Sequence, residues 1–160
     1  MKLFLQFQIG QEGYVLEATR IACVLPLLDI KSIPRAPAGV VGVFNYRGNP
    51  VPVIDLSELA LGVPAPRHLS TRLILVLFAV DDGPDGHKRD RLLGLIAEKV
   101  TETIRRGPAD FAPAGVTSAA APYLGPVTSV GGRLLQWIEV PQLLPREVSE
   151  TLFRDIGASA

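Results

Sequence analysis

One stretch, GVVGVFNYRGNPVPVIDL at residues 39–56, constrains the fold more than any other part of the chain. Two apolar runs, residues 40–46 and 51–56, are rich in β-branched side chains and flank a short polar segment. Runs of this length, separated by Gly, Asn and Pro, are typical of paired strands joined by a tight turn. Gly48 can supply the positive φ that such a turn needs. The sequence therefore predicts a β-hairpin with one charged residue, Arg47, between two core strands.

Most of the remaining chain carries the same signature of short strands. Residues 3–9 alternate apolar with polar side chains, which indicates a strand with one apolar face, and the solid apolar run at 72–80 indicates a strand buried on both faces. Gly131-Gly132 suits a primed hairpin turn. Further strands are expected at residues 14–16, 92–97, 100–104, 123–130 and 133–139. The pattern predicts an all-β protein with minor α content, either a sandwich or a pair of small barrels.

One short helix is expected inside the strand pattern. Asp55 can accept hydrogen bonds from the first free amides of a helix, and Gly62 can end it. Residues 63–66, VPAP, predict a linker and a subdomain boundary, and the charged residues 81–91 predict a solvated hairpin loop. Residues 18–24 fit a helical turn or a strand, so both assignments stay open.

The C-terminus changes from strand spacing to helical spacing. Leu144, Val148 and Leu152 recur every four residues, which predicts a short amphipathic helix. We expect one domain over residues 1–155, a length that a shared core can support, and a frayed tail at residues 156–160.

Composition favours a soluble protein of the cytoplasm. The 160 residues carry no formal net charge, so no global field points to nucleic acid or acidic substrates. The single cysteine excludes an internal disulfide and fits a reducing compartment. The N-terminus lacks the apolar core of a signal peptide, and the apolar run at residues 73–80 is too short to cross a bilayer. The apolar share of 48% fits a large core, apolar surface kept for partners, or both.

Few residues offer catalytic chemistry. His68 and His87 fall in polar loops without carboxylates or cysteine at metal or triad spacing, so we expect both on the surface. Cys23 sits in an apolar run without basic neighbours, which indicates a buried, unreactive thiol. Glu98 and Glu102 alternate with apolar residues and are expected to face solvent. The sequence predicts no enzyme, no cofactor and no metal; a regulatory barrel that binds a small apolar ligand stays open as an alternative.

The order of the motifs adds a family resemblance. G-x-x-N-x-R-G at residues 42–48 and P-V-x-D-L at 52–56 follow an N-terminal strand and a Pro-containing connector, and the match continues through Leu-Gly-Leu-Ile, Tyr-Leu-Gly and Leu-Leu further along the chain. This order resembles the CheW-like family of chemosensory coupling proteins over essentially the whole chain. The resemblance implies two five-stranded SH3-like barrels with a shared hydrophobic core and a C-terminal helix. The first barrel would hold mainly residues 10–65 and the C-terminal segment, and the second mainly residues 70–140.

The resemblance also implies a function and partners. Such proteins are non-enzymatic adaptors that tie the cytoplasmic tip of a methyl-accepting chemoreceptor to a CheA-type histidine kinase, in arrays at the inner face of the membrane. The helical tip would lie in an apolar groove, where buried apolar anchors supply the affinity. The family motifs map the receptor groove onto Ile21, Val24, Arg47 and Val100. For the kinase contact the sequence offers only a location, the second-barrel strands around Leu93, Leu95 and Ile96.

A narrower resemblance and two departures concern the pathway. FNYRGNPVPV, LALG and LSTRL look like the Wsp-type adaptors, whose surface-sensing pathway controls cyclic-di-GMP. Cys23 stands where the family has a Glu that pairs with the motif arginine, so Arg47 needs another partner or faces water. The family's V-D-x-V in the second barrel reads Ala-Glu-Lys-Val at residues 97–100. We expect a dedicated receptor rather than a general chemotaxis receptor.

Overall fold

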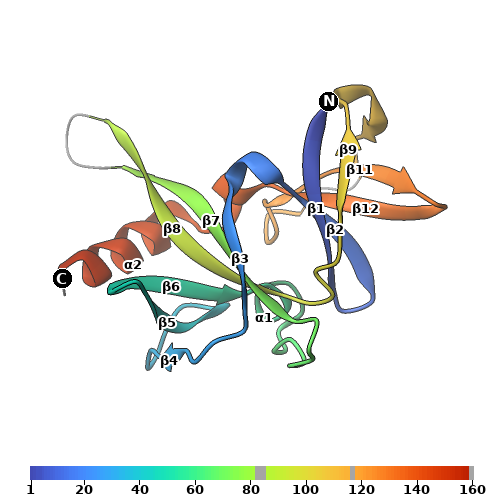
Figure 1. Cartoon of the computed structure of the whole chain (residues 1–160). Coiled ribbons are helices and arrows are strands. Elements are labelled where there is room, and N and C mark those ends of the chain that lie inside the picture. The colour runs from blue at the N-terminus through green and yellow to red at the C-terminus, as the bar shows by residue number, and fades with distance from the viewer. Residues whose placement is uncertain (82–85, 116–117, 159–160) are drawn as a thin grey trace.

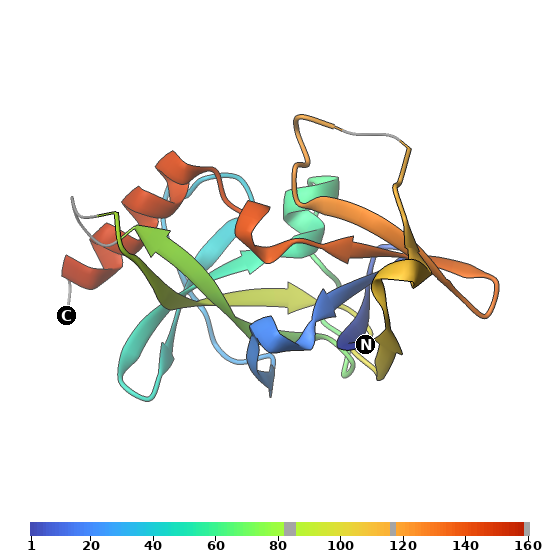
Figure 2. The ribbon, with the colours of Figure 1, turned by 90° about the horizontal axis from the view of Figure 1, so that it is seen from above.

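The computed structural model describes the backbone of residues 1–81, 86–115 and 118–158. In this part of the chain the strands form two mixed sheets, with helices beside them (Figure 1). Seen from above, the N-terminal strand and the C-terminal helix lie toward opposite ends of the molecule (Figure 2). The all-β class with minor α content is therefore confirmed.

The first sheet joins segments from both ends of the chain. Its strand order is β10-β11-β12-β2-β1-β9, and β12 and β2 run parallel while the other neighbours are antiparallel. The parallel pair is what ties the N-terminal hairpin to the C-terminal one. The strands are β1 (Lys2–Ile9), β2 (Glu12–Glu17), β9 (Thr103–Arg106), β10 (Phe111–Ala112), β11 (Leu124–Val130) and β12 (Arg133–Ile138).

The second sheet comes from the middle of the chain. Its order is β3-β7-β8-β6-β5-β4, so β3 and β4 are its edges and β8 lies in its interior. β6 and β8 run parallel, and the other neighbours are antiparallel. The strands are β3 (Ile21–Pro26), β4 (Lys31–Ser32), β5 (Val40–Tyr46), β6 (Asn49–Asp55), β7 (Arg72–Asp81) and β8 (Lys88–Ala97).

Each sheet contains five longer strands and one two-residue strand, β10 in the first and β4 in the second. The division of strands differs from the expected barrels, because residues 21–97 supply the second sheet and residues 2–17 and 103–138 supply the first. The boundary expected at residues 63–66 falls inside the second sheet, where β6 pairs with β8 across the linker. Parallel pairing needs a long crossover, which α1, the linker and β7 provide.

The short helix α1 (Leu56–Leu61) begins and ends at the residues that the sequence indicates. The Asp55 carboxylate accepts hydrogen bonds from the backbone N–H groups of Ser57 at 2.9 Å and Glu58 at 3.3 Å. Gly62 closes the helix with a φ of 77°. Both signals act within a few residues, which is why they can be recognised without the tertiary structure.

The remaining helical segments connect or cover the sheets. Residues 18–24 satisfy both open assignments, because the 3-10 turn η1 (Ala18–Arg20) leads directly into β3. Two further 3-10 turns are η2 (Pro108–Asp110) and η3 (Val140–Gln142). The C-terminal helix α2 (Arg146–Ala158) continues past residue 155, where fraying was expected, and residues 159–160 lie outside the described part.

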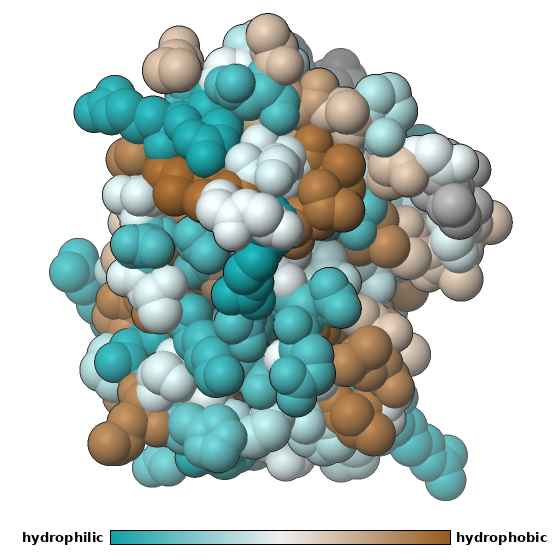
Figure 3. Space-filling view, turned by 90° about the vertical axis from the view of Figure 1, so that its right-hand side faces the viewer, coloured by the Kyte–Doolittle hydropathy of each residue, from teal (hydrophilic) through white to brown (hydrophobic). Residues whose placement is uncertain are grey.

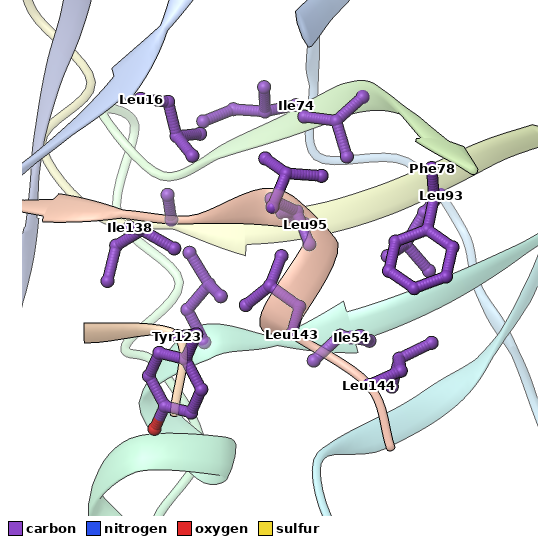
Figure 4. Close-up of a cluster of buried hydrophobic side chains, with 14 of the residues drawn as sticks. Leu16, Ile54, Ile74, Phe78, Leu93, Leu95, Tyr123, Ile138, Leu143 and Leu144 are labelled. Carbon is purple, nitrogen blue, oxygen red and sulfur yellow. The ribbon is translucent and has the colours of Figure 1, made fainter. Parts of the chain in front are cut away.

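A central cluster of buried apolar side chains lies between the two sheets and draws on both (Figure 4). On β7, Ile74, Val76 and Phe78 enter this cluster, whereas Leu73 and Leu75 point to the opposite side of the sheet. This alternation is the two-residue period of a strand that is covered on both faces. The shared hydrophobic core is therefore confirmed, and α2 closes one side of it.

Each sheet also curls around a smaller cluster of its own. The second-sheet cluster contains Phe44, Val53 and Leu73, among others. The first-sheet cluster is aromatic, and the Phe4 ring meets the Trp137 ring edge-on with centroids 4.9 Å apart. Figure 3 shows the end of the molecule that carries the first sheet, where hydrophilic side chains separate smaller apolar groups. This face offers no single continuous apolar patch.

Two local expectations are corrected by pairing between distant segments. β7 and β8 pair as far as Asp81 and Lys88, so the loop expected at residues 81–91 is shorter, and residues 82–85 lie outside the described part. Residues 98–102 form no strand but run along β1 with backbone hydrogen bonds to it. Glu98 is consequently only 8% exposed and accepts a hydrogen bond from the Gly10 N–H at 3.0 Å, whereas Glu102 is exposed as expected.

Candidate partner-binding surface

The predicted hairpin ends in a two-residue turn at Arg47 and Gly48. Their φ values of 54° and 86° are both left-handed, and Tyr46 pairs with Asn49 across the turn, as in a type I′ turn. The Asn45 side-chain oxygen accepts a hydrogen bond from the Gly48 N–H at 2.7 Å. The N-x-R-G motif therefore has a local cause: asparagine and glycine hold the turn, and arginine occupies a left-handed position at its tip.

Arg47 extends from this turn into solvent. Its guanidinium carbon lies 5.2 Å from the centroid of the Tyr46 ring, within the range of a cation–π contact. The Tyr46 hydroxyl lies 3.9 Å from Sγ of Cys23, which is half-buried rather than fully buried as predicted. Among the described ion pairs none includes Arg47. An aromatic ring and solvent thus surround the guanidinium, for which the resemblance implies a carboxylate in other members.

The edge strand β3 has two different faces. Cys23 and Leu25 pack into the second-sheet cluster, whereas Val24 on the other face is 41% exposed. A bulge between Ile21 and Cys23 interrupts the strand, and Ile21 packs against the central cluster while staying partly exposed. Ala22, Val24 and Pro26 make up the exposed face of this uncharged edge strand, and neighbouring exposed apolar residues are typical of a contact surface.

Val100 reaches the central cluster from the loop between β8 and β9. Its backbone N–H donates to the Ser70 carbonyl at 3.3 Å, and its side chain is partly buried. The four residues predicted for the receptor surface therefore fall into two groups that are connected by contacts within each group. Ile21 and Val100 share the central cluster, and Arg47 is joined to β3, the strand of Val24, through Tyr46 and Cys23.

The residues predicted for the kinase contact are part of the core. Leu93 and Leu95 are 0% exposed and enter the central cluster, and Ile96 is 2% exposed and enters the second-sheet cluster. β8 lies between β7 and β6, so both of its edges are paired, and the central cluster covers one of its faces while the second-sheet cluster covers the other. These side chains do not form a contact surface, because an interior strand between two clusters buries both of its faces.

Two polar side-chain atoms among the described residues are buried without a hydrogen-bond partner, Nε of Arg20 and Oε1 of Gln6. Arg20 lines a recess of about 260 Å³ between η1 and η3, together with Glu17, Trp137 and Glu139. Gln6 lines another of about 380 Å³ between β1 and the loop that contains Val100. The sequence does not single out Arg20 or Gln6, because their burial depends on segments far away in the chain.

The charge of Glu17 beside the Arg20 recess is paired with that of Lys2. Burial raises the pKa of Glu17, but hydrogen bonds from Lys2 and Thr19 and the positive charges of Lys2 and Arg20 outweigh it, so the pKa lies below its ordinary value. The Lys2 Nζ lies 2.9 Å from Oε1 of Glu17. Glu17 is therefore an ionised, already partnered carboxylate at the rim of the recess.

A recess of about 880 Å³ lies between the end of β7, η3 and the start of α2. Charged side chains line it, and Arg146 bridges Asp81 at 3.1 Å and Glu150 at 3.0 Å. Sites for small apolar ligands are enclosed and mostly apolar. This recess therefore does not favour the alternative of a barrel that senses an apolar molecule.

The remaining candidate chemistry is sparse. His68 and His87 are both exposed, as predicted. In the described part of the chain, no group of three or more His, Cys, Asp or Glu side chains is arranged to hold a metal ion. None of the helices described has the length and apolar character that crossing a membrane requires.

Comparison with known proteins places this chain in a family. The family model described as the CheW-like domain matches residues 3–148. The chemotaxis protein CheW of Helicobacter pylori is 31% identical over 111 residues, a match that covers 69% of this chain and 61% of that protein. This chain thus spans less than two thirds of that relative. The chemotaxis protein CheW of Rhizobium meliloti is 23% identical over 146 residues, covering 90% of this chain and 88% of that protein.

A solved structure shares the fold. The scaffolding protein TtCheW from Thermoanaerobacter tengcongensis superposes with a TM-score of 0.74 at 23% identity, covering 90% of this chain and 88% of that one. The family model and this fold agree with the motif order around the Arg47 turn. The chain therefore belongs to the CheW-like family.

Proposed function

We propose that this protein is an adaptor that couples the cytoplasmic tip of a methyl-accepting chemoreceptor to a CheA-type histidine kinase. The observation that carries the proposal is the pairing of a CheW-like fold with an exposed apolar edge strand beside the Arg47 turn. The relatives named as chemotaxis proteins and the structure named as a scaffolding protein support the same role. The adaptor would work in the cytoplasm, at the inner face of the membrane, through receptor arrays.

The proposed receptor surface comprises Ile21, Val24, Arg47 and Val100. Val24 supplies an apolar anchor that is 41% exposed, and Ile21 and Val100 are partly exposed side chains on the central cluster. Arg47 supplies a charge held at the tip of an ordered turn. A helix binds such a surface through apolar anchors, while the charge contributes specificity and faster encounter.

The kinase partner is proposed from the family relation. Leu93, Leu95 and Ile96 lie inside the molecule, so a kinase must contact other, exposed residues. Receptor and kinase can then bind at the same time if their surfaces do not overlap. A variant that affects only one of the two partners tests this arrangement.

Co-purification from cells tests the proposal directly. The tagged wild-type protein is expected to retain both the receptor and the kinase, detected with specific antibodies. Val24→Asp places a charge on the proposed anchor and should lose the receptor while keeping the kinase. Leu134→Asp is the matched control, because Leu134 is 64% exposed on β12 in the other sheet. Retention of the receptor by Val24→Asp, or absence of both partners from the wild type, would contradict the proposal.

We propose further that the pathway served is of the surface-sensing type with cyclic-di-GMP output. The motifs that resemble Wsp-type adaptors support this, as does Cys23 at the usual acidic position, which leaves Arg47 without its carboxylate. Deleting the gene should then change cellular cyclic-di-GMP and leave swimming chemotaxis intact. A pull-down with both receptor types is the second test, and equal binding to both would contradict a dedicated receptor.

A further inference from the structure

A loop between α1 and β7 presents one almost fully exposed leucine. Leu69 is 95% exposed, the highest value among the large apolar side chains that the structure describes as exposed. It begins the LSTRL stretch at residues 69–73, none of which belongs to the proposed receptor surface. A single exposed leucine is ordinary on a protein surface, so its meaning depends on how the loop holds it and on what surrounds it.

Hydrogen bonds fix the backbone on both sides of Leu69. The Thr71 side chain is buried, and its hydroxyl donates to the Pro66 carbonyl at 2.7 Å and accepts from the His68 N–H at 3.1 Å. The Thr71 N–H donates to the His68 carbonyl at 3.1 Å, and the Arg72 guanidinium donates to the Leu69 carbonyl. An anchor that is held in place before binding loses little conformational entropy when it binds, so this loop is suited to present Leu69 to a partner.

The loop is continuous with the proposed receptor surface. Arg72, whose guanidinium holds the Leu69 carbonyl, pairs with Pro26 at the end of the edge strand β3. At the neighbouring position of the loop, the Ser70 carbonyl accepts a hydrogen bond from the Val100 N–H at 3.3 Å. Leu69 is thus connected both to β3 and to the segment that contains Val100.

The charges around Leu69 are mainly basic. Residues 59–80 contain no Asp or Glu, and the exposed Arg67 lies two residues before Leu69. Lys99 and Arg133 line the recess of about 380 Å³ that extends to this loop, where the acidic residue among the described lining is Glu102. A partner that complements this surface carries acidic side chains beside the apolar position that receives Leu69.

We propose that Leu69 is a further receptor anchor, which inserts between the side chains of two successive turns of a helix on the receptor's tip. An Asp or Glu of that helix faces the basic side chains around Leu69. This inference rests on the proposed function, because it extends the same receptor surface. A helix offers a suitable gap between residues i, i+3, i+4 and i+7, as in the packing of coiled coils. Leu69 is therefore a specificity-determining residue, since it binds only where the receptor has both the gap and the acidic neighbour.

Calorimetric binding of the receptor's cytoplasmic tip fragment, from the receptor identified by co-purification, tests the inference. Leu69→Ser removes the apolar side chain and should weaken binding at least about ten-fold. Leu69→Met keeps an apolar side chain of similar volume and should stay within about three-fold of wild type. Leu134→Ser is the matched control, because Leu134 is 64% exposed on β12 in the other sheet. Thermal unfolding of each variant shows whether the fold is retained.

Two further variants test the ordered loop and its charge. Thr71→Val removes the hydroxyl that holds the loop and should weaken binding, but it should add little to the loss in Leu69→Ser, because both act through the same anchor. Arg67→Glu reverses a charge beside Leu69 and should slow association, with a difference from wild type that shrinks at high salt. Equal association rates of Arg67→Glu and wild type at low salt would overturn the assignment of an acidic neighbour.

The outcomes separate this inference from the proposed function. If the wild type binds the tip and Leu69→Ser binds it equally well, the inference is overturned while the proposed function stands. The inference also fails if Leu69→Ser keeps the receptor and loses the kinase in co-purification. It fails as well if Leu69→Ser dissociates a dimer of the wild type without changing receptor binding. If the wild type binds no receptor tip, the proposed function itself fails.

Discussion

Replacing Arg47 distinguishes a residue that stabilises the hairpin from one that contacts a partner. The structure predicts a contact role, because Arg47 is exposed and its described interaction is with the Tyr46 ring at 5.2 Å. Arg47→Ala keeps a non-glycine residue at a φ of 54° and loses this cation–π contact. At an exposed site that contact contributes about 0.5–1 kcal/mol. Receptor binding, by contrast, should be weakened, because the charge contributes to specificity and to the rate of encounter.

The variant Arg47→Gly tests the backbone contribution to stability. Glycine removes the penalty of the left-handed backbone, about 1–2 kcal/mol. Two losses nearly cancel this gain: the greater freedom of the unfolded chain costs about 0.5–1 kcal/mol, and the contact with the Tyr46 ring is lost. The free energy of unfolding should therefore stay within about 1 kcal/mol of wild type, a change of about 2–4 °C in Tm for a chain of this size.

The assay combines thermal unfolding, followed by circular dichroism, with receptor co-purification. Arg35→Ala is the matched control, because Arg35 is also exposed and also left-handed, with a φ of 56°, but lies outside the hairpin. It should change neither stability nor binding appreciably. A loss of more than about 2 kcal/mol in Arg47→Ala would make Arg47 a structural residue and refute the reasoning. Full receptor binding by Arg47→Ala would refute the contact role.

Three further predictions concern stability. Val53→Asp should unfold the protein in a thermal melt, because Val53 is 0% exposed and a carboxylate there has no partner. Gly42→Ala should lower the free energy of urea unfolding by more than about 2 kcal/mol, because its Cβ would lie 2.0 Å from the Lys31 carbonyl oxygen; Gly107→Ala is the milder control, because its φ is −101° and the nearest atom would lie 3.7 Å from its Cβ. Because the pKa of Glu17 is lowered in the folded state, its contribution to stability is present above pH 4.5, its unfolded value, and is lost on acidification. In Glu17→Gln the free energy of unfolding should therefore fall less steeply as the pH is lowered below 4.5. An unchanged pH dependence would contradict this.

Local signals in the sequence predicted the turns and caps. The Asp55 cap, the Gly62 stop and the hairpin around Arg47 follow from contacts within a few residues. The turn at residues 131–132, with φ values of 57° and 80°, belongs with them. Turn and cap chemistry depends on the neighbours in the chain, so the residue types are enough to indicate it.

Pairing between distant segments could not be predicted from local residue types. The parallel pairs β12 with β2 and β6 with β8 determine which strands share a sheet, and no local pattern specifies them. Backbone hydrogen bonds with Gln8 bury Glu98 along β1, and pairing with β6 and β7 places Leu93 in the interior of the second sheet. Alternation shows that a strand has an apolar face, but only the assembled layers show whether its other face meets solvent.

The same distinction between local and distant contacts applies to the candidate partner-binding surface. The sequence by itself determined the N-x-R-G turn and the family to which the chain belongs. Tertiary structure decided that Arg47 meets the Tyr46 ring and solvent, that Val24 is exposed and that Leu93 lies inside the central cluster. Residue identity sets the chemistry that a side chain offers, whereas its burial and its partners are set by segments that the fold brings beside it.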